Sequence, residues 1–462
     1  MVKERGLISE EYKEQLLASN DIRFSDGSVV TPSEIWDYLE NAAEELPLLK
    51  EPRGLESRGF SHDTGFIPSL KNFYLNVTLS ERMEKAKSQG VTIAFRQGGH
   101  EIDAFTAAGT RALRPPSVIQ WGRDRQKRKN TFAKEQFEIR QDREKALKDI
   151  SFECCQTAGY ECIQAGNLPI DIVVAFTNPR CADVYYSTEA HRHGKRAHEV
   201  DRFLVDYPLN NQADKEWAVK YFADNLRRLT ERLDRFQDKK TTEEDLRNAI
   251  KFHNRGRRLA KEIAELWWSA DVPPTNSAAR SNLFAMGALE MHGDPVATLS
   301  VLEEAKELLK ERVENGVLAK GVERNAKRIY VLGACVSPNT RTCEKEGAVV
   351  VGHDDFWNHI SLLVEEEGDP YYNLAKTTLE YPYEQAIIQR AEWEVEQIKK
   401  SRADGVIFMY SWGCNTQSAV SRPISDYIKQ KTGLPTIIYE RNIREMPSEQ
   451  EQTRTSAFIE ML

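Results

Sequence analysis

Long apolar runs are absent from this sequence, and their absence excludes several classes of protein. No stretch of about 18 consecutive apolar residues occurs, so we expect no membrane-spanning helix. The first residues, MVKERGLISEEYKEQ, lack the apolar segment of a secretion signal, which favours a cytoplasmic location. Basic residues are not in excess, and the net charge of −8 argues against a general nucleic-acid-binding protein.

Cysteines are few and odd in number, seven in 462 residues, and no secretion signal accompanies them. A disulfide framework is therefore a poor interpretation, and reduced thiols or metal ligands are better ones. His191, His193 and His198 lie close together, but this cluster has no cysteine pair at zinc-finger spacing and no HExxH motif. We interpret the histidine segment as a surface loop.

Four of the cysteines gather in one stretch, residues 150–183, which carries most of the functional signal. Its second half, IDIVVAF at 170–176, is short, β-branched and nearly uncharged, as expected of a buried parallel strand. Cys181 follows the end of that strand, in a loop that contains Asn178 and Pro179. Open α/β sheets bind ligands at the carboxyl ends of their strands, so Cys181 lies at an edge where ligands bind.

A second strand followed by a cysteine occurs near the C-terminus. The strand-like run DGVIFMY at 404–410 leads directly into SWGCN, which contains Cys414. Two strand-end cysteines from distant parts of the chain could meet across a cleft, and Cys154, at the start of an apparent helix, could supply a third thiolate. Three thiolates and an open fourth position suit an iron–sulfur cluster that binds a substrate directly.

Strands alternate with helices in two parts of the chain, and this rhythm predicts parallel sheets covered on both faces. We predict an α/β fold with two doubly wound, flavodoxin-like lobes at 81–212 and 326–462, bridged by helices at 213–325. A capping box at Thr241–Glu244 is predicted to start the long bridging helix. Residues 1–80 form a helical N-terminal extension, interpreted as a packing or dimerisation arm. The expected strands are 91–95, 170–176, 203–206, 327–333, 348–351, 404–410 and 436–439.

An acidic residue, Asp103, falls in the first turn of the helix expected after the glycine-containing turn at 97–99. On local grounds alone, its carboxylate would simply complement the helix dipole. A basic run, RDRQKRKN at 123–130, is interpreted as a solvated face of the protein. The alternative interpretation is that it binds an anionic ligand, such as the phosphates of a coenzyme.

Taken together, these segments resemble the family of 2-hydroxyacyl-CoA dehydratases and benzoyl-CoA reductases, over about residues 80–462. No single motif is unique to that family, but their order and spacing are specific. The motifs are SFEC at 151–154, DIVVAFTNPRC at 171–181, RIYVLGA…EKEGAVVVGHDD, ADGVIFMYSWGCN at 403–415, TGLPTIIYERN and the terminal TRTSAFIEML. Members of the family pair two homologous α/β subunits, each of which holds an iron–sulfur cluster.

The resemblance implies that Cys154, Cys181 and Cys414 are the thiolate ligands of a 4Fe-4S cluster. The 26 residues between Cys154 and Cys181 match the interval between the family's first two ligands, which favours Cys154 over its neighbour Cys155. The family's acidic residue, usually a Glu before an AAG-type segment, falls on Asp103 of DAFTAAG, which is one methylene shorter. We predict a catalytic role for Asp103 by this correspondence.

Two polar residues, Ser411 and Asn415, flank Cys414 and are predicted to position the substrate; the alternative is that both are ordinary turn residues. The LFAMGALEMHGD helix and the SWGCN loop make the C-terminal half resemble the substrate-binding type of subunit.

The function implied by the resemblance is a subunit of an oxygen-sensitive 2-hydroxyacyl-CoA dehydratase, a lyase that works anaerobically. Three ligands leave the fourth iron free to coordinate the thioester carbonyl or the hydroxyl of an acyl-CoA. One electron from an ATP-dependent iron–sulfur activator protein gives a ketyl radical, which makes the β-hydrogen acidic so that hydroxide leaves. Asp103 then bonds the hydroxyl or moves a proton. The second subunit is a homologue or another copy of this chain.

Other functions stay open at this point. Cys162, Cys335 and Cys343 raise the number of candidate ligands to six, as in the related double-cubane cluster proteins, which hold an 8Fe-9S cluster. Against this, GHDD at 352–355 stands where those proteins have a cysteine. An ATP-dependent reductase of an acyl-CoA or another small substrate is the enzymatic alternative. A metal scaffold without turnover, or inert buried cysteines in an unrelated α/β fold, are the non-enzymatic ones.

Overall fold

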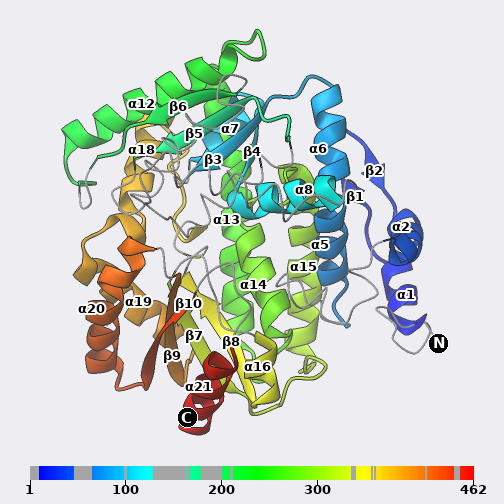
Figure 1. Ribbon diagram of the computed structural model, residues 1–462, viewed down its shortest axis with the longest axis vertical. Coiled ribbons are helices and arrows are strands. Elements are labelled where there is room, and N and C mark those ends of the chain that lie inside the picture. The colour runs from blue at the N-terminus through cyan, green and yellow to red at the C-terminus, as the bar shows by residue number, and fades with distance from the viewer. Residues whose placement is uncertain are drawn as a thin grey trace.

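Two four-stranded parallel sheets joined by helices form the body of the molecule, so the predicted fold class is confirmed (Figure 1). A helical N-terminal part packs beside them. Among the residues described below, no helix is long and apolar enough to cross a membrane. The computed structural model describes residues 10–45, 65–97, 101–127, 163, 167–177, 200–208, 212–333, 340–354, 357, 360–411, 414–441 and 448–462.

Helices cover both faces of the first sheet, as its short apolar strands predict. Its strands, all parallel, run in the order β4 (Arg111–Leu113), β3 (Ile93–Gln97), β5 (Ile172–Phe176) and β6 (Asp201–Val205). Alternate residues point to opposite cores, with Ile93 and Phe95 on one face and Ala94 on the other. The first face packs on α6 (Leu79–Ser88) and α8 (Pro115–Lys127), and the second on α7 (Ile102–Ala107) and α12 (Glu216–Asp234).

The second sheet repeats this arrangement. Its parallel strands run in the order β10 (Thr436–Arg441), β9 (Gly405–Ser411), β7 (Lys327–Leu332) and β8 (Ala348–His353). Tyr330 and Leu332 enter one core, and Ile329 and Val331 enter the other. The first of these cores contains α14 (Ser277–Met286), α19 (Ile387–Lys400) and α20 (Asn415–Thr432), and the second contains α16 (Thr340–Lys345) and α21 (Glu449–Glu460).

A long helix, α13 (Glu243–Ser269), runs between the two lobes through the middle of the molecule (Figure 1). It packs on α7 of the first lobe, on α14, on α15 (Pro295–Glu314) and on α18 (Pro370–Glu380). Its capping box starts one residue later than predicted, because Thr242 and Asp245 exchange the two bonds instead of Thr241 and Glu244. The sequence TTEED offers both registers, because an acidic residue lies three positions after each threonine.

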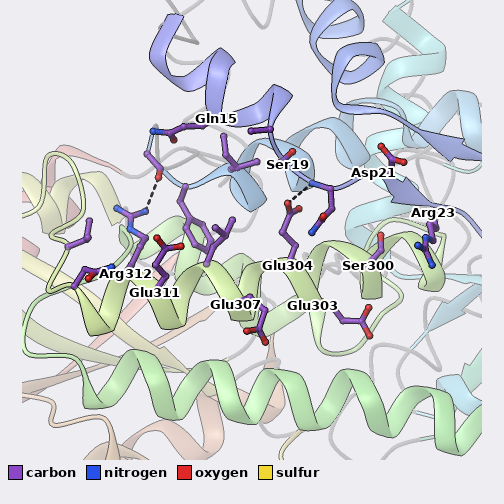
Figure 2. A pocket seen from close by; sticks show the side chains of 18 residues that line it. Gln15, Ser19, Asp21, Arg23, Ser300, Glu303, Glu304, Glu307, Glu311 and Arg312 are labelled. Carbon is purple, nitrogen blue, oxygen red and sulfur yellow. Dashed lines mark hydrogen bonds between the residues drawn. The ribbon is translucent and has the colours of Figure 1, made fainter.

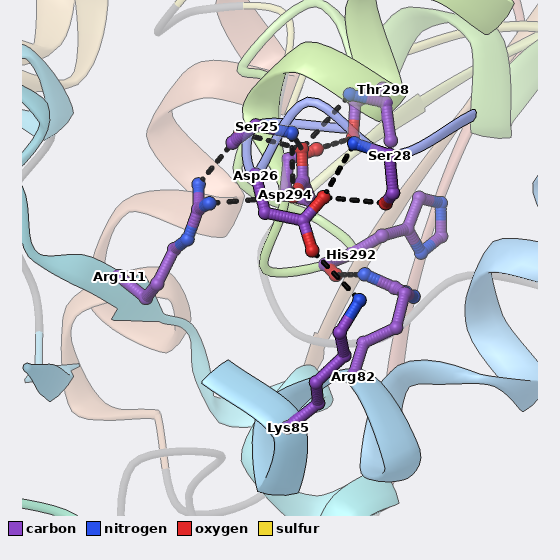
Figure 3. Close-up of polar contacts among 10 residues, drawn as sticks. Ser25, Asp26, Ser28, Arg82, Lys85, Arg111, His292, Asp294 and Thr298 are labelled. Carbon is purple, nitrogen blue, oxygen red and sulfur yellow. Dashed lines mark hydrogen bonds and ion pairs between the residues drawn. The ribbon is translucent and has the colours of Figure 1, made fainter. Parts of the chain in front are cut away.

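The N-terminal part is tied to the lobes by polar contacts as well as by apolar ones. It contains α1 (Glu10–Leu17), a hairpin of β1 (Ile22–Arg23) and β2 (Val29–Val30), α2 (Pro32–Glu45) and α5 (Ile67–Val77). Asp294 caps α15 by accepting the Ala297 N–H, and it also accepts the Ser25 hydroxyl at 2.7 Å and pairs with Arg111 (Figure 3). This one carboxylate therefore joins the hairpin, β4 and α15. The sequence did not predict the hairpin or β4, because strands of two or three residues carry no periodic pattern.

Candidate functional site

Cys414 lies where the sequence placed it, at the carboxyl edge of the second sheet. It follows β9 and precedes α20 directly, and its side chain is half-buried. Two backbone bonds hold it there, because the Cys414 N–H donates to the Ser411 carbonyl at 2.8 Å and the Cys414 carbonyl accepts the Ser418 N–H at 3.0 Å. The thiol thus lies at the positive end of an 18-residue helix, a location that favours a thiolate.

Ser411 is buried at the end of β9, and Asn415 is the first residue of α20. The two therefore flank Cys414 along the chain as predicted, and their role in substrate binding stays a prediction. Cys154 and Cys181, with Cys155, Cys162 and Cys335, lie outside the described residues. Within the described ranges no group of three or more His, Cys, Asp or Glu side chains is arranged to hold a metal ion. Of the three cysteines implied as cluster ligands, the described residues include one, Cys414, and its thiol fits that role.

The neighbouring strand end is held in a conformation that only glycine adopts easily. Gly333 follows β7 with a φ of +106°, and a Cβ there would lie 1.7 Å from the Met409 carbonyl oxygen. Its N–H donates to the Asp354 carboxylate at 2.9 Å, and its carbonyl lies 3.1 Å from His353 Nε2. These bonds therefore join the ends of β7 and β8, and Gly333 lies close against the backbone of β9.

Asp103 lies in the first turn of α7, beyond the end of β3, as predicted. It is fully buried and forms a two-pronged ion pair with Arg257 of α13, at 3.0 and 2.6 Å. Burial opposes the charge of Arg257, but Asp103 and Tyr381 together outweigh burial and hold the pKa of the guanidinium above its ordinary value. Arg257 also donates to the Asn254 side chain at 3.1 Å. Asp103 is thus an oriented hydrogen-bond acceptor rather than a loose surface carboxylate.

A small polar cavity of about 20 Å³ adjoins Arg257 and is large enough for one water molecule. Glu290 lies at its wall and accepts from Arg96 at 2.6 Å and from Arg114 at 3.0 Å. His253 also lines it, and its Nε2 lies 2.8 Å from the Thr106 hydroxyl. The region between the lobes is therefore polar and charged, in contrast to the apolar cores on either side.

Buried histidines give the molecule a predicted acid sensitivity. Burial, as the largest cause, lowers the pKa of His253 to about 4 and that of His292 to about 3. In the unfolded chain both protonate near a pKa of about 6.5, so below that pH the unfolded state binds protons that the folded state does not. The free energy of unfolding should therefore fall by about 1.4 kcal/mol per pH unit for each histidine.

Urea unfolding at about pH 7 and about pH 5.5 tests this, with an expected loss of about 2.5 kcal/mol from the two histidines. His292→Gln keeps a hydrogen-bonding group beside Asn72, which lies 2.7 Å from His292 Nε2, and should remove about half of the loss. An equal loss in the variant and the parent chain would contradict the assignment.

A pocket with a volume of about 920 Å³ lies elsewhere, between residues 15–23 and α15 (Figure 2). Its wall is acidic, with Glu303, Glu307 and Glu311 on α15, and Glu304 is paired with the buried Lys71. None of the residues predicted for the functional site lines it.

Sequence reasoning missed Arg257, the partner of Asp103. It lies in FHNRGRRLAKE, where three arginines occur within four positions and only one of them is buried. The one available signal is the helical spacing of the buried positions of α13, since Arg257 lies four residues after His253 and three before Ala260.

Comparison with known proteins agrees with the geometry. A family model described as 2-hydroxyglutaryl-CoA dehydratase, D-component, matches residues 139–462. The chain is 24% identical over 229 residues to the putative dehydratase subunit YjiM of Escherichia coli (strain K12), across 48% of this chain and 58% of that protein. It is 26% identical over 266 residues to one subunit of the benzoyl-CoA reductase of Thauera aromatica, across 54% of this chain and 65% of that protein.

Less than two thirds of the length of each of these relatives is therefore spanned by the match. The family model, in contrast, covers well over half of the chain and confirms the resemblance drawn from the sequence motifs. The chain belongs to the 2-hydroxyglutaryl-CoA dehydratase D-component family.

Proposed function

We propose that this chain is the cluster-bearing subunit of an oxygen-sensitive 2-hydroxyacyl-CoA dehydratase, with Cys154, Cys181 and Cys414 as ligands of a 4Fe-4S cluster. The observation that carries the proposal is the half-buried Cys414 thiol, at the carboxyl end of β9 and the amino end of α20. Parallel sheets bind ligands at this edge, and the helix end favours the anionic thiolate that a cluster requires.

A bound cluster would supply a Lewis-acidic iron and the one-electron chemistry that a radical elimination of water requires. The chain's own residues orient and polarise the substrate. Asp103, held by Arg257, presents a fixed acceptor for the hydroxyl group or for a proton. Ser411 and Asn415, on either side of Cys414 in the chain, position the acyl group.

The proposed function also implies partner proteins and a substrate. The family model is named for one component of the enzyme, and the Thauera relative is named as one subunit of a reductase. We therefore expect a homologous second subunit or a second copy of this chain, an acyl-CoA substrate, and an ATP-dependent iron–sulfur activator protein. Reduction of an acyl-CoA is the second candidate, favoured by the similarity to part of a benzoyl-CoA reductase.

Anaerobic purification followed by iron and sulfide analysis tests the proposal. About four of each per chain are expected, whereas about eight iron and nine sulfide indicate a double cubane, and zinc alone indicates a scaffold. Incubation with the activator, ATP and a 2-hydroxyacyl-CoA should then form the enoyl-CoA without a net reductant. A product that consumes two electrons per turnover would support the reductase instead.

A further inference from the structure

Arg390 of α19 is buried at the carboxyl edge of the second sheet and makes contacts with three separate segments. Its Nη2 donates to the Asp354 carboxylate at 3.0 Å and to the Gln417 side-chain oxygen at 3.2 Å. Its guanidinium also stacks on the ring of Tyr383, 3.8 Å from the ring centre. One cation thus connects the end of β8, the segment before α19 and the first turn of α20.

Asp354 extends the network to the other strand ends. One of its oxygens binds Arg390, and the other accepts the N–H of Gly333, whose glycine-specific conformation follows β7. Asp354 is fully buried, so Arg390 offsets a charge that is costly to hold in the interior. Asp354 therefore joins Arg390 to the backbone that follows β7.

Glu394, one turn after Arg390 on α19, is a second carboxyl group beside this arginine. It is fully buried, 3.8 Å from Arg390 Nε, and burial together with the charge of Asp354 raises its pKa well above the ordinary value. Burial and the neighbouring Asp354 thus both disfavour a charge on Glu394, while Arg390 pairs with Asp354 at 3.0 Å. Arg390 is therefore engaged with two buried carboxyl groups and with Gln417, which indicates a structural task for it.

Gln417 is the link to the candidate site. It is buried in the first turn of α20, three residues after Cys414, and it accepts the hydrogen bond from Arg390. The backbone bonds from Cys414 to Ser411 and Ser418 tie the thiol-bearing residue to that same turn. Gln417 therefore links Arg390 to the helical turn that begins at Cys414.

We infer that Arg390 and Gln417 are positioning residues, which hold the first turn of α20 and thereby the Cys414 thiol in one orientation before any metal binds. That this thiol is a cluster ligand rests on the proposed function, but its positioning does not. The Arg390–Gln417 bond keeps the half-buried thiol partly protected from reagents in the metal-free chain.

Pulsed alkylation of the full-length, metal-free chain with iodoacetamide, read peptide by peptide by mass spectrometry, tests the inference. Gln417→Ala removes the acceptor without changing charge and should raise the alkylation rate of Cys414 about tenfold. Gln417→Glu restores an acceptor for Arg390 and should return the rate close to that of the parent chain.

Two controls separate positioning from general loosening. Gln397→Ala removes another buried glutamine, one that lies on α19 and bonds Trp357 at 2.9 Å, so it should leave the Cys414 rate unchanged. Cys343, which is fully buried in the opposite core, should stay unmodified in every variant. An unchanged rate in Gln417→Ala, or an equal rise in Gln397→Ala, would overturn the inference.

The cluster gives an independent readout. In the iron-loaded protein, Gln417→Ala should release iron to a chelator faster than Gln397→Ala does. Should Cys414→Ala retain its full iron content, the proposed function fails, while the alkylation comparison still decides whether Arg390 and Gln417 position the thiol.

Discussion

Replacing Cys414 with alanine is expected to abolish iron binding, whereas Cys343→Ala leaves the iron content unchanged. The two thiols differ in their surroundings. Cys414 is half-buried at the start of α20, where the helix end favours a thiolate. Cys343 is fully buried against α21 and β10, and burial raises the pKa of its thiol to about 12. A thiol that stays protonated is a poor metal ligand.

Iron and acid-labile sulfide per chain, measured without exposure to air, give the readout, and Cys181→Ala should behave as Cys414→Ala does. Cys343→Ala is the matched control, since it removes a thiol from the same lobe at the cost of a small apolar cavity. Loss of iron from this control would favour ligation by six cysteines and an 8Fe-9S cluster, and it would count against the single cubane.

Arg257→Met is expected to lower the free energy of unfolding by about 3–5 kcal/mol, because it leaves the Asp103 carboxylate buried and unpaired. Adding Asp103→Leu should recover most of that loss, since replacing both members of a buried pair by apolar residues is often neutral. Urea denaturation of the two single variants and the double variant measures the coupling between them.

The neighbouring arginine supplies the control. Arg258 is half-exposed and pairs with Glu366 at 2.6 Å, so Arg258→Met should cost less than about 1 kcal/mol. Activity measurements distinguish a structural role of Asp103 from a catalytic one. Asp103→Asn, which keeps the shape of the side chain, should lower kcat by about 10²-fold or more if the carboxylate moves a proton. A stable Asp103→Asn enzyme with unchanged kcat would restrict Asp103 to a structural role.

Parallel strands were the part of the fold most readily predicted from sequence. Runs such as IVVAF in β5 and GVIFMY in β9 are short, apolar and bounded by turns, and these strands are buried along nearly their whole length. β4 escaped prediction because RAL is three residues long and, among the described strands, pairs with β3 alone. The tertiary neighbour, not the local sequence, decides that these residues form a strand.

The candidate site residues likewise fall into those that the sequence predicted and those that it did not. Cys414 and Asp103 were placed correctly at strand ends, because position after a parallel strand specifies an edge of the sheet. Arg257 and Arg390 were not foreseen, since each lies on a highly charged helix and is buried only because a carboxylate from a distant segment meets it. Pairings across 154 and 36 residues cannot be read from one sequence.

The N-terminal part has a consequence for how this molecule can be divided. Tyr12, Trp36 and Phe66 belong to the same apolar core as Trp267 of α13 and Phe408 of β9. In an excised C-terminal lobe, the apolar side chains that the N-terminal part now covers would be exposed to water. Trimming the chain to the region shared with its relatives would thus yield an insoluble fragment rather than a minimal enzyme.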